Sequence, residues 1–169
     1  SMDGTTIGTT LFNLDVEGSD SVLTMYCIDF RTAIRSDAWY LEDDWANYPG
    51  EGDFAQPGKV HWILQNGYPA VDVDTLASKA DTNRLNQQEA LAATQAAIWY
   101  FSNDVDLDRR NQPNVRALFD YFVENAEDLP QTAEPESTLK ITPSEASGNA
   151  GEVVGEFTIE TSAPDVPVH

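Results

Sequence analysis

The stretch LNQQEALAATQAAIWYF, residues 85–101, decides the fold around it. Asn86 can accept a hydrogen bond from a free backbone N–H group, and Glu89 stands three residues later, which is the pattern of a helix-starting capping box. A helix is therefore predicted over residues 87–101.

A glutamine lies inside the apolar face of this helix. At 100° per residue one face carries Leu91, Gln95, Ile98 and Trp99, while residues 96 and 97 fall away from it. A buried primary amide whose donors and acceptor stay unpaired costs about 1–3 kcal/mol per group. Gln95 must therefore meet a partner, and the simplest interpretation is a hydrogen bond to nearby backbone.

The single cysteine, Cys27, lies in SVLTMYCIDF, residues 21–30. The alternation of β-branched and aromatic residues predicts a strand that is apolar on both faces and interior to a sheet. A lone cysteine in such a strand is ordinarily an inert small hydrophobe. One cysteine can form neither an internal disulfide nor a cysteine-rich zinc site.

Three motifs together resemble a known family. YCIDF (residues 26–30), KVHWILQNGYP (59–69) and TQAAIW (94–99) occur in the order seen in thioester domains of Gram-positive surface adhesins and pilus-tip proteins. The family pattern is an aromatic residue before a cysteine, then a later Thr-Gln-x-Ala-Ile/Val-Trp. The resemblance covers roughly residues 20–125.

The resemblance implies a chemical role for the buried glutamine. The thiol of Cys27 would attack the carboxamide of Gln95, ammonia would leave, and a Cys-Gln thioester would remain. An amine on a host cell-surface, plasma or matrix protein, expected to be a lysine, would then attack this thioester and form a stable amide. This is single-turnover covalent binding rather than enzymatic turnover, and it needs no cofactor and no metal.

Supporting roles are less defined. Tyr26 and Trp99 can supply apolar walls that keep water from a thioester, or simply belong to the core. The Thr94 hydroxyl can donate to the developing oxyanion or bond back to its own helix. Asp29 lies near the cysteine as a candidate base or as an ordinary hydrogen-bonding acid, so the base is left unassigned.

Composition agrees with an extracellular module. The net charge of -20 over 169 residues excludes a nucleic-acid backbone partner, argues against anionic membranes, and favours either lysine-rich protein partners or mere solubility. No run of about 20 apolar residues occurs, so no membrane insertion is expected. We expect a monomeric fragment of a protein anchored to the cell wall or at a pilus tip of a Gram-positive bacterium.

The predicted fold class is α+β, with an antiparallel sheet portion packed on a small helical portion that carries the TQAAIW helix. Strands are predicted within residues 5–30, a long loop over 31–58, and helices at 59–66, 87–101 and 114–126. Residues 1–3 resemble an expression scar, and residues 4–136 form the predicted thioester domain. Strands within 137–169 either complete that domain or start an Ig-like stalk domain.

Three alternatives remain. DVDLD, residues 104–108, spaces aspartates like the start of a calcium loop, but Arg109 stands where the loop needs glycine. Cys27 with His61 could form a papain-like hydrolase, although a predicted strand lacks the helix N-terminus that activates such a thiol. The chain could also be a non-covalent binding or spacer domain in which Cys27 and Gln95 are merely packed.

Overall fold

The structure is a computed structural model that describes residues 1–18, 20, 22–35, 38–41 and 55–130, and the backbone of two strands at 139–142 and 158–161. The chain divides into two compact units, Ser1–Gln131 and Thr132–His169. Residues 42–54 of the predicted loop lie outside the described residues. The loop residues 31–35 and 38–41 contain no helix or strand.

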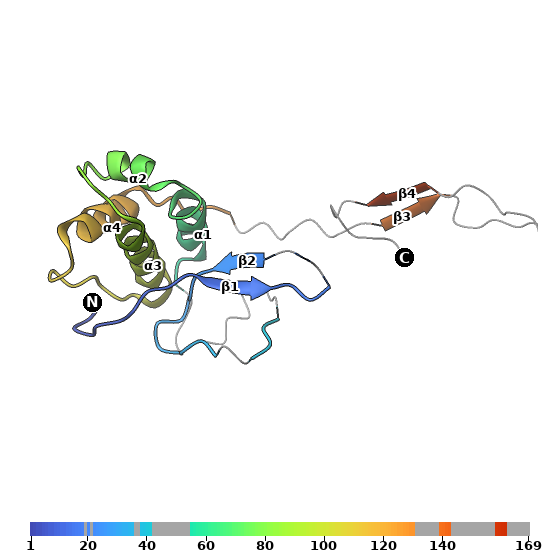
Figure 1. The fold of residues 1–169 in the computed structure, drawn as a ribbon, viewed down its shortest axis with the longest axis horizontal. Coiled ribbons are helices and arrows are strands. Elements are labelled where there is room, and N and C mark those ends of the chain that lie inside the picture. The colour runs from blue at the N-terminus through green and yellow to red at the C-terminus, as the bar shows by residue number, and fades with distance from the viewer. Residues whose placement is uncertain are drawn as a thin grey trace, which may run out of the picture. The chain divides into compact units, whose positions relative to one another are not determined.

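The described part of the first unit contains four helices, labelled in Figure 1. These are α1 (Pro57–Asn66), α2 (Val73–Lys79), α3 (Gln87–Asn103) and α4 (Pro113–Asn125). The predicted helices at 59–66, 87–101 and 114–126 are therefore confirmed within two residues at each end. The short helix α2 was not predicted.

Local signals set the ends of these helices. The Asn86 side chain accepts from the backbone N–H of Glu89 (2.9 Å), and the Glu89 carboxylate accepts from the backbone N–H of Asn86 (3.0 Å), so the predicted capping box is present. Gly67 ends α1, where its amide donates to the carbonyl of Ile63 at 2.7 Å. Asp72 starts α2 by accepting from the backbone of Thr75.

Helix α3 is the central element of the helical group, and it contacts α1, α2 and α4 (Figure 1). Every residue from 93 to 99 is buried, so Ala96 and Ala97, which fall away from the face of Gln95, are buried as well. A helix surrounded by other elements buries its whole circumference. The small side chains of Ala90, Ala93 and Ala97 are fully buried and allow the neighbouring helices to approach closely.

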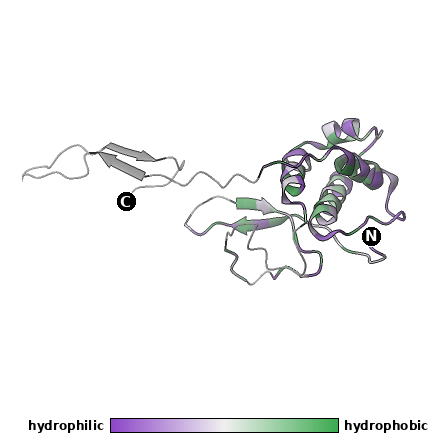
Figure 2. Cartoon of the chain, turned by 180° about the vertical axis from the view of Figure 1, so that it is seen from behind, coloured by the Kyte–Doolittle hydropathy of each residue, from purple (hydrophilic) through white to green (hydrophobic). Residues whose placement is uncertain are grey.

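The N-terminal strands form an antiparallel hairpin, in which β1 (Phe12–Asp15) pairs with β2 (Val22–Met25) and Phe12 lies opposite Met25. An α+β fold class is thus confirmed. The prediction that Cys27 lies in an interior strand is wrong, since β2 ends two residues before it. Val22 and Leu23 are 56% and 52% exposed, so the hydrophobic colour of this strand in Figure 2 does not mark a buried sheet.

The first residues of the chain take part in the fold. Met2 is only 3% exposed and forms an isolated bridge with Leu107, and the Ser1 carbonyl accepts from the backbone of Asp108 and the side chain of Asn111. That residues 1–3 are an expression scar stays a prediction. Whatever the origin of this segment, Met2 helps to fill the core.

The second unit is described through β3 (Leu139–Thr142) and β4 (Thr158–Thr161), which pair antiparallel with Leu139 opposite Thr161. Both strands lie inside segments predicted to be extended. Whether they complete the first domain or start a stalk domain stays a prediction. Among the described residues no helix is both long and apolar enough to cross a bilayer.

Candidate functional site: a buried glutamine held against the cysteine

The segment after β2 lies extended along one face of α3. The Ser102 hydroxyl donates to the carbonyl of Ile28 at 3.0 Å, and the Asn103 side-chain oxygen accepts from the backbone N–H of Phe30 at 3.1 Å. Positions seven and eight residues after Gln95 share its face of the helix. Helix side chains therefore satisfy backbone groups that a strand partner would otherwise satisfy, which explains why β2 ends at Met25.

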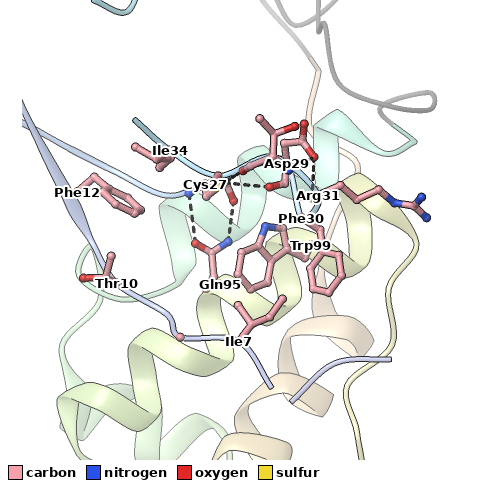
Figure 3. A pocket seen from close by; sticks show the side chains of 13 residues that line it. Ile7, Thr10, Phe12, Cys27, Asp29, Phe30, Arg31, Ile34, Gln95 and Trp99 are labelled. Carbon is pink, nitrogen blue, oxygen red and sulfur yellow. Dashed lines mark hydrogen bonds between the residues drawn. The ribbon is translucent and has the colours of Figure 1, made fainter. Parts of the chain in front are cut away.

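Gln95 makes a two-point contact with the backbone of Cys27. The Cys27 N–H donates to Gln95 Oε1 at 3.2 Å, and Gln95 Nε2 donates to the Cys27 carbonyl at 2.7 Å (Figure 3). Because a backbone N–H only donates and a carbonyl only accepts, this pairing fixes which end of the amide is oxygen. Gln95 is 1% exposed, and its amide is paired as the simplest interpretation expects, but with the backbone of the one cysteine.

Cys27 is a free, half-buried thiol. Its Sγ donates to the Asp29 carbonyl at 3.1 Å. Burial raises the pKa of the Cys27 thiol, and the negative charge of Asp29 raises it further. The hydrogen bond to the Asp29 backbone and the Trp99 indole lower the pKa and only partly offset this rise. The thiol is therefore predominantly protonated at neutral pH, so any attack on Gln95 is driven by proximity rather than by acidity.

The cysteine and the glutamine line one pocket of about 320 Å³. Figure 3 shows its walls: Gln95 and Trp99 come from α3, and the remaining residues come from the segments 7–12 and 27–34. Trp99 is 5% exposed and packs edge-on against Phe30, with ring centroids 5.3 Å apart. The two aromatic rings give Cys27 and Gln95 a partly apolar surrounding.

Asp29 also lines this pocket, as a hydrogen-bonding acid. Its Oδ1 accepts from the backbone N–H groups of Arg31 (2.8 Å) and Thr32 (3.2 Å), which stabilises a turn in the chain shortly after the cysteine. This geometry matches the ordinary role considered for Asp29. A base remains unassigned.

Thr94 and Tyr26 support the site from outside the pocket lining. The Thr94 hydroxyl donates its single hydrogen to the Ala90 carbonyl at 2.9 Å and accepts from the backbone N–H of Tyr68 at 3.1 Å. It bonds back to its own helix, so it is not oriented as an oxyanion donor. The Tyr26 hydroxyl donates to the Tyr68 carbonyl at 2.6 Å, and burial raises its pKa. Both side chains tie the turn after α1 to the site.

Ser102 and Asn103 are site residues that sequence reasoning missed. The signal was present, because extending the 3.6-residue period from Gln95 by two turns reaches both positions. They are polar residues on an otherwise apolar face, and each docks the cysteine-bearing segment. Both hydrogen-bond to the backbone of the segment that carries Cys27.

The alternative chemistries gain no support from the described residues. His61 Nε2 lies 2.8 Å from Gln65 Nε2, and His61 is not among the residues that line the pocket of Cys27. Within the described chain no cluster of three or more histidine, cysteine, aspartate or glutamate residues could hold a metal ion. Asp108 instead accepts hydrogen bonds from the backbone of Gly4.

Comparison with curated proteins found no match. A solved structure described as the Bacillus anthracis TIE protein is similar, with 25% sequence identity and a TM-score of 0.34 over 63% of this chain. The matched part is 20% of that protein's length. A family model described as thioester domain matches residues 24–128, which is more than half of the chain and includes both Cys27 and Gln95. The chain therefore belongs to the thioester domain family.

Proposed function

We propose that this domain forms an internal thioester between Cys27 and Gln95 and uses it once to attach covalently to an amine on a target protein. The observation that supports this proposal is the two-point contact between the Gln95 amide and the Cys27 backbone. It holds the electrophilic carbonyl next to the backbone of the one cysteine in the chain, and both residues line the same pocket. Proximity of this kind supplies most of what an unactivated amide needs in order to react.

Closure of the thioester has a simple atomic balance. Cys27 Sγ attacks the side-chain carbonyl carbon of Gln95, the carbon–nitrogen bond breaks, and the amide nitrogen leaves as ammonia with the thiol proton. The Cys27 N–H, which already donates to Oε1 at 3.2 Å, is placed to stabilise the negative charge that develops on that oxygen. The cysteine thus supplies both the nucleophile and an oxyanion donor.

Attack by a target amine reverses the same path with a different nitrogen. The amine adds to the Gln95 carbonyl, the bond to sulfur breaks, and Cys27 recovers its thiol. The Cys27 carbonyl, which accepts from the nitrogen of the unreacted amide at 2.7 Å, is placed to accept from the incoming amine. Since only the neutral amine attacks and the pKa of lysine is about 10.4, the rate rises with pH unless a protein base assists.

The biological setting follows from this chemistry. A single-use covalent bond suits an adhesin module, so we place the domain in an extracellular surface protein of a Gram-positive bacterium. A lysine on a host cell-surface, plasma or matrix protein is the expected target. The net charge of -20 favours encounter with lysine-rich surfaces.

The test uses methylamine as the probe at mildly alkaline pH. Intact protein is expected to gain one adduct on Gln95 and, at the same time, one titratable thiol at Cys27. Gln87 and Gln88, which are exposed glutamines on the same helix, serve as internal controls and are expected to stay unmodified. An adduct on these residues, or an adduct without a new thiol, would contradict the proposal.

A second arm replaces methylamine with a lysine-containing peptide and compares the parent with Gln95→Ala. The parent is expected to form a complex that survives boiling in denaturant, and Gln95→Ala is expected to form none. A non-covalent spacer domain would form no such complex in either protein. Release of product from many substrate molecules per protein would instead indicate a hydrolase.

A further inference from the structure

The indole of Trp99 carries a polar group that the fold leaves unpaired. Trp99 is only 5% exposed, and its Nε1 is buried and has no hydrogen-bond partner among the described residues. An unpaired buried donor destabilises the fold, so such groups are rare unless they have a use. Trp99 lines the same pocket as Cys27 and Gln95.

The ring is held so that this N–H points to a defined place. Figure 3 shows the indole beside Gln95, with its nitrogen on the side of Cys27 and Asp29. Phe30 packs edge-on against the ring at 5.3 Å between centroids and an interplanar angle of 83°, which restricts its rotation. The oxygen of Gln95 already accepts from the Cys27 N–H, and the Cys27 sulfur donates its S–H to the Asp29 carbonyl.

We propose that Trp99 is a catalytic residue whose indole N–H donates a hydrogen bond to the Cys27 sulfur when that sulfur carries negative charge. This inference rests on the proposed function, because charge reaches the sulfur as it attacks Gln95 and again as it leaves during attack by an amine. A neutral thiol or thioester sulfur is a poor acceptor, and a thiolate is a good one. The donor therefore binds the transition state more strongly than the ground state.

The electrostatics of the thiol agree with this geometry. The Trp99 indole is one of the groups that lower the pKa of Cys27, against the larger opposing effect of burial. The protonated thiol directs its hydrogen to the Asp29 carbonyl. An indole N–H next to the sulfur favours the thiolate form of Cys27.

The experiment compares Trp99→Phe with Phe30→Leu. The first removes the N–H and keeps an aromatic ring, whereas the second removes the ring that packs on Trp99 and keeps the N–H. The first readout is the rate at which methylamine opens the thioester. The second is the pH dependence of iodoacetamide alkylation of the free thiol in a Gln95→Ala background, which does not require a thioester to form.

Trp99→Phe is expected to slow opening by methylamine about tenfold or more, since a hydrogen bond to a charged group is lost. It is also expected to move the pH midpoint of alkylation upward, and Phe30→Leu, which loosens the indole but keeps its N–H, is expected to move that midpoint less. An unchanged midpoint in Trp99→Phe, or an equal change in Phe30→Leu, overturns the inference. If Trp99→Phe does not fold, benzothienylalanine at position 99 replaces the N–H by sulfur at nearly constant shape.

The two proposals fail separately. If the parent protein forms no thioester, the proposed function is wrong, and the pH midpoint of alkylation still tests the contact between Trp99 and the Cys27 sulfur. Parent protein that forms the thioester, with Trp99→Phe matching it in both readouts, removes only the role of Trp99.

Discussion

Gly67 is the position where one added methyl group is expected to disturb the site most. An alanine Cβ there would lie 2.6 Å from Thr94 Cγ2 and 2.7 Å from the Ile63 carbonyl oxygen. The Ile63 oxygen cannot retreat without undoing the end of α1, because it accepts from the Gly67 amide. Thr94 is held by bonds to Ala90 and Tyr68. The backbone φ of Gly67 is -96°, so alanine itself is tolerated and steric overlap is the whole effect.

Overpacking of this kind costs about 1–3 kcal/mol. We expect Gly67→Ala to lower the free energy of unfolding by about 2 kcal/mol and the Tm by roughly 5–10 °C. The effect is measured by urea denaturation in a Cys27→Ala background, so that no internal bond masks it. In the parent background the displaced Thr94 shifts the neighbouring Gln95, and intact mass is expected to show less thioester.

Gly8→Ala is the matched control for stability, because a Cβ at that position meets nothing within 4 Å. It is expected to change the free energy of unfolding by less than about 0.5 kcal/mol. The reasoning would be refuted if Gly67→Ala were as stable as Gly8→Ala. It would also be refuted if Gly67→Ala lost stability but kept the full amount of thioester, since the coupling through Thr94 would then be absent.

Two further predictions concern the docking of the cysteine segment and the state of its thiol. Ser102→Ala is expected to lower the free energy of unfolding by about 1 kcal/mol and to slow thioester closure, because the Ile28 carbonyl loses its donor. The control Ser78→Ala removes the exposed bond to the Asp74 carbonyl and is expected to leave closure unchanged. Equal closure rates in the two variants would contradict this prediction. Burial raises the pKa of the Cys27 thiol, so native Gln95→Ala protein keeps a proton that the unfolded chain loses above pH about 8.5. The stability from this group is complete below that pH and is lost as pH rises toward the folded pKa. Between pH 7 and 10 the urea midpoint is expected to fall more steeply with pH for Gln95→Ala than for the same protein with Cys27→Ala added. Parallel curves would show that folding does not shift the pKa of the Cys27 thiol.

The helix that carries the site could be predicted because its signals are local. The capping box of Asn86 and Glu89 and the burial of Gln95 are both found in the structure. The helix α2 has a similar start, in which Asp72 accepts from Thr75, and was missed because only Leu76 of its residues is buried. A seven-residue helix spans too few turns to show the apolar periodicity from which helices are predicted.

The placement of Cys27 could not be predicted from its own neighbours. The alternation around it favours a strand, and β2 does begin at Val22. The strand stops because Gln95, Ser102 and Asn103 take the backbone groups that a second strand would need. That competition depends on a helix about seventy residues later in the chain, so no local pattern contains it. The same tertiary contact brings the backbone of Cys27 to the Gln95 amide.

The thioester between Cys27 and Gln95 is tested most directly by the intact mass of the purified protein, followed by peptide mapping. We expect a mass lower than the sequence mass by one ammonia, with Cys27 and Gln95 recovered in one linked peptide. Cys27→Ala is expected to show its full sequence mass. A parent protein with its full sequence mass and a freely alkylated Cys27 would contradict the account. A deficit that persists in Cys27→Ala would do the same, because the lost ammonia would then come from another pair of residues.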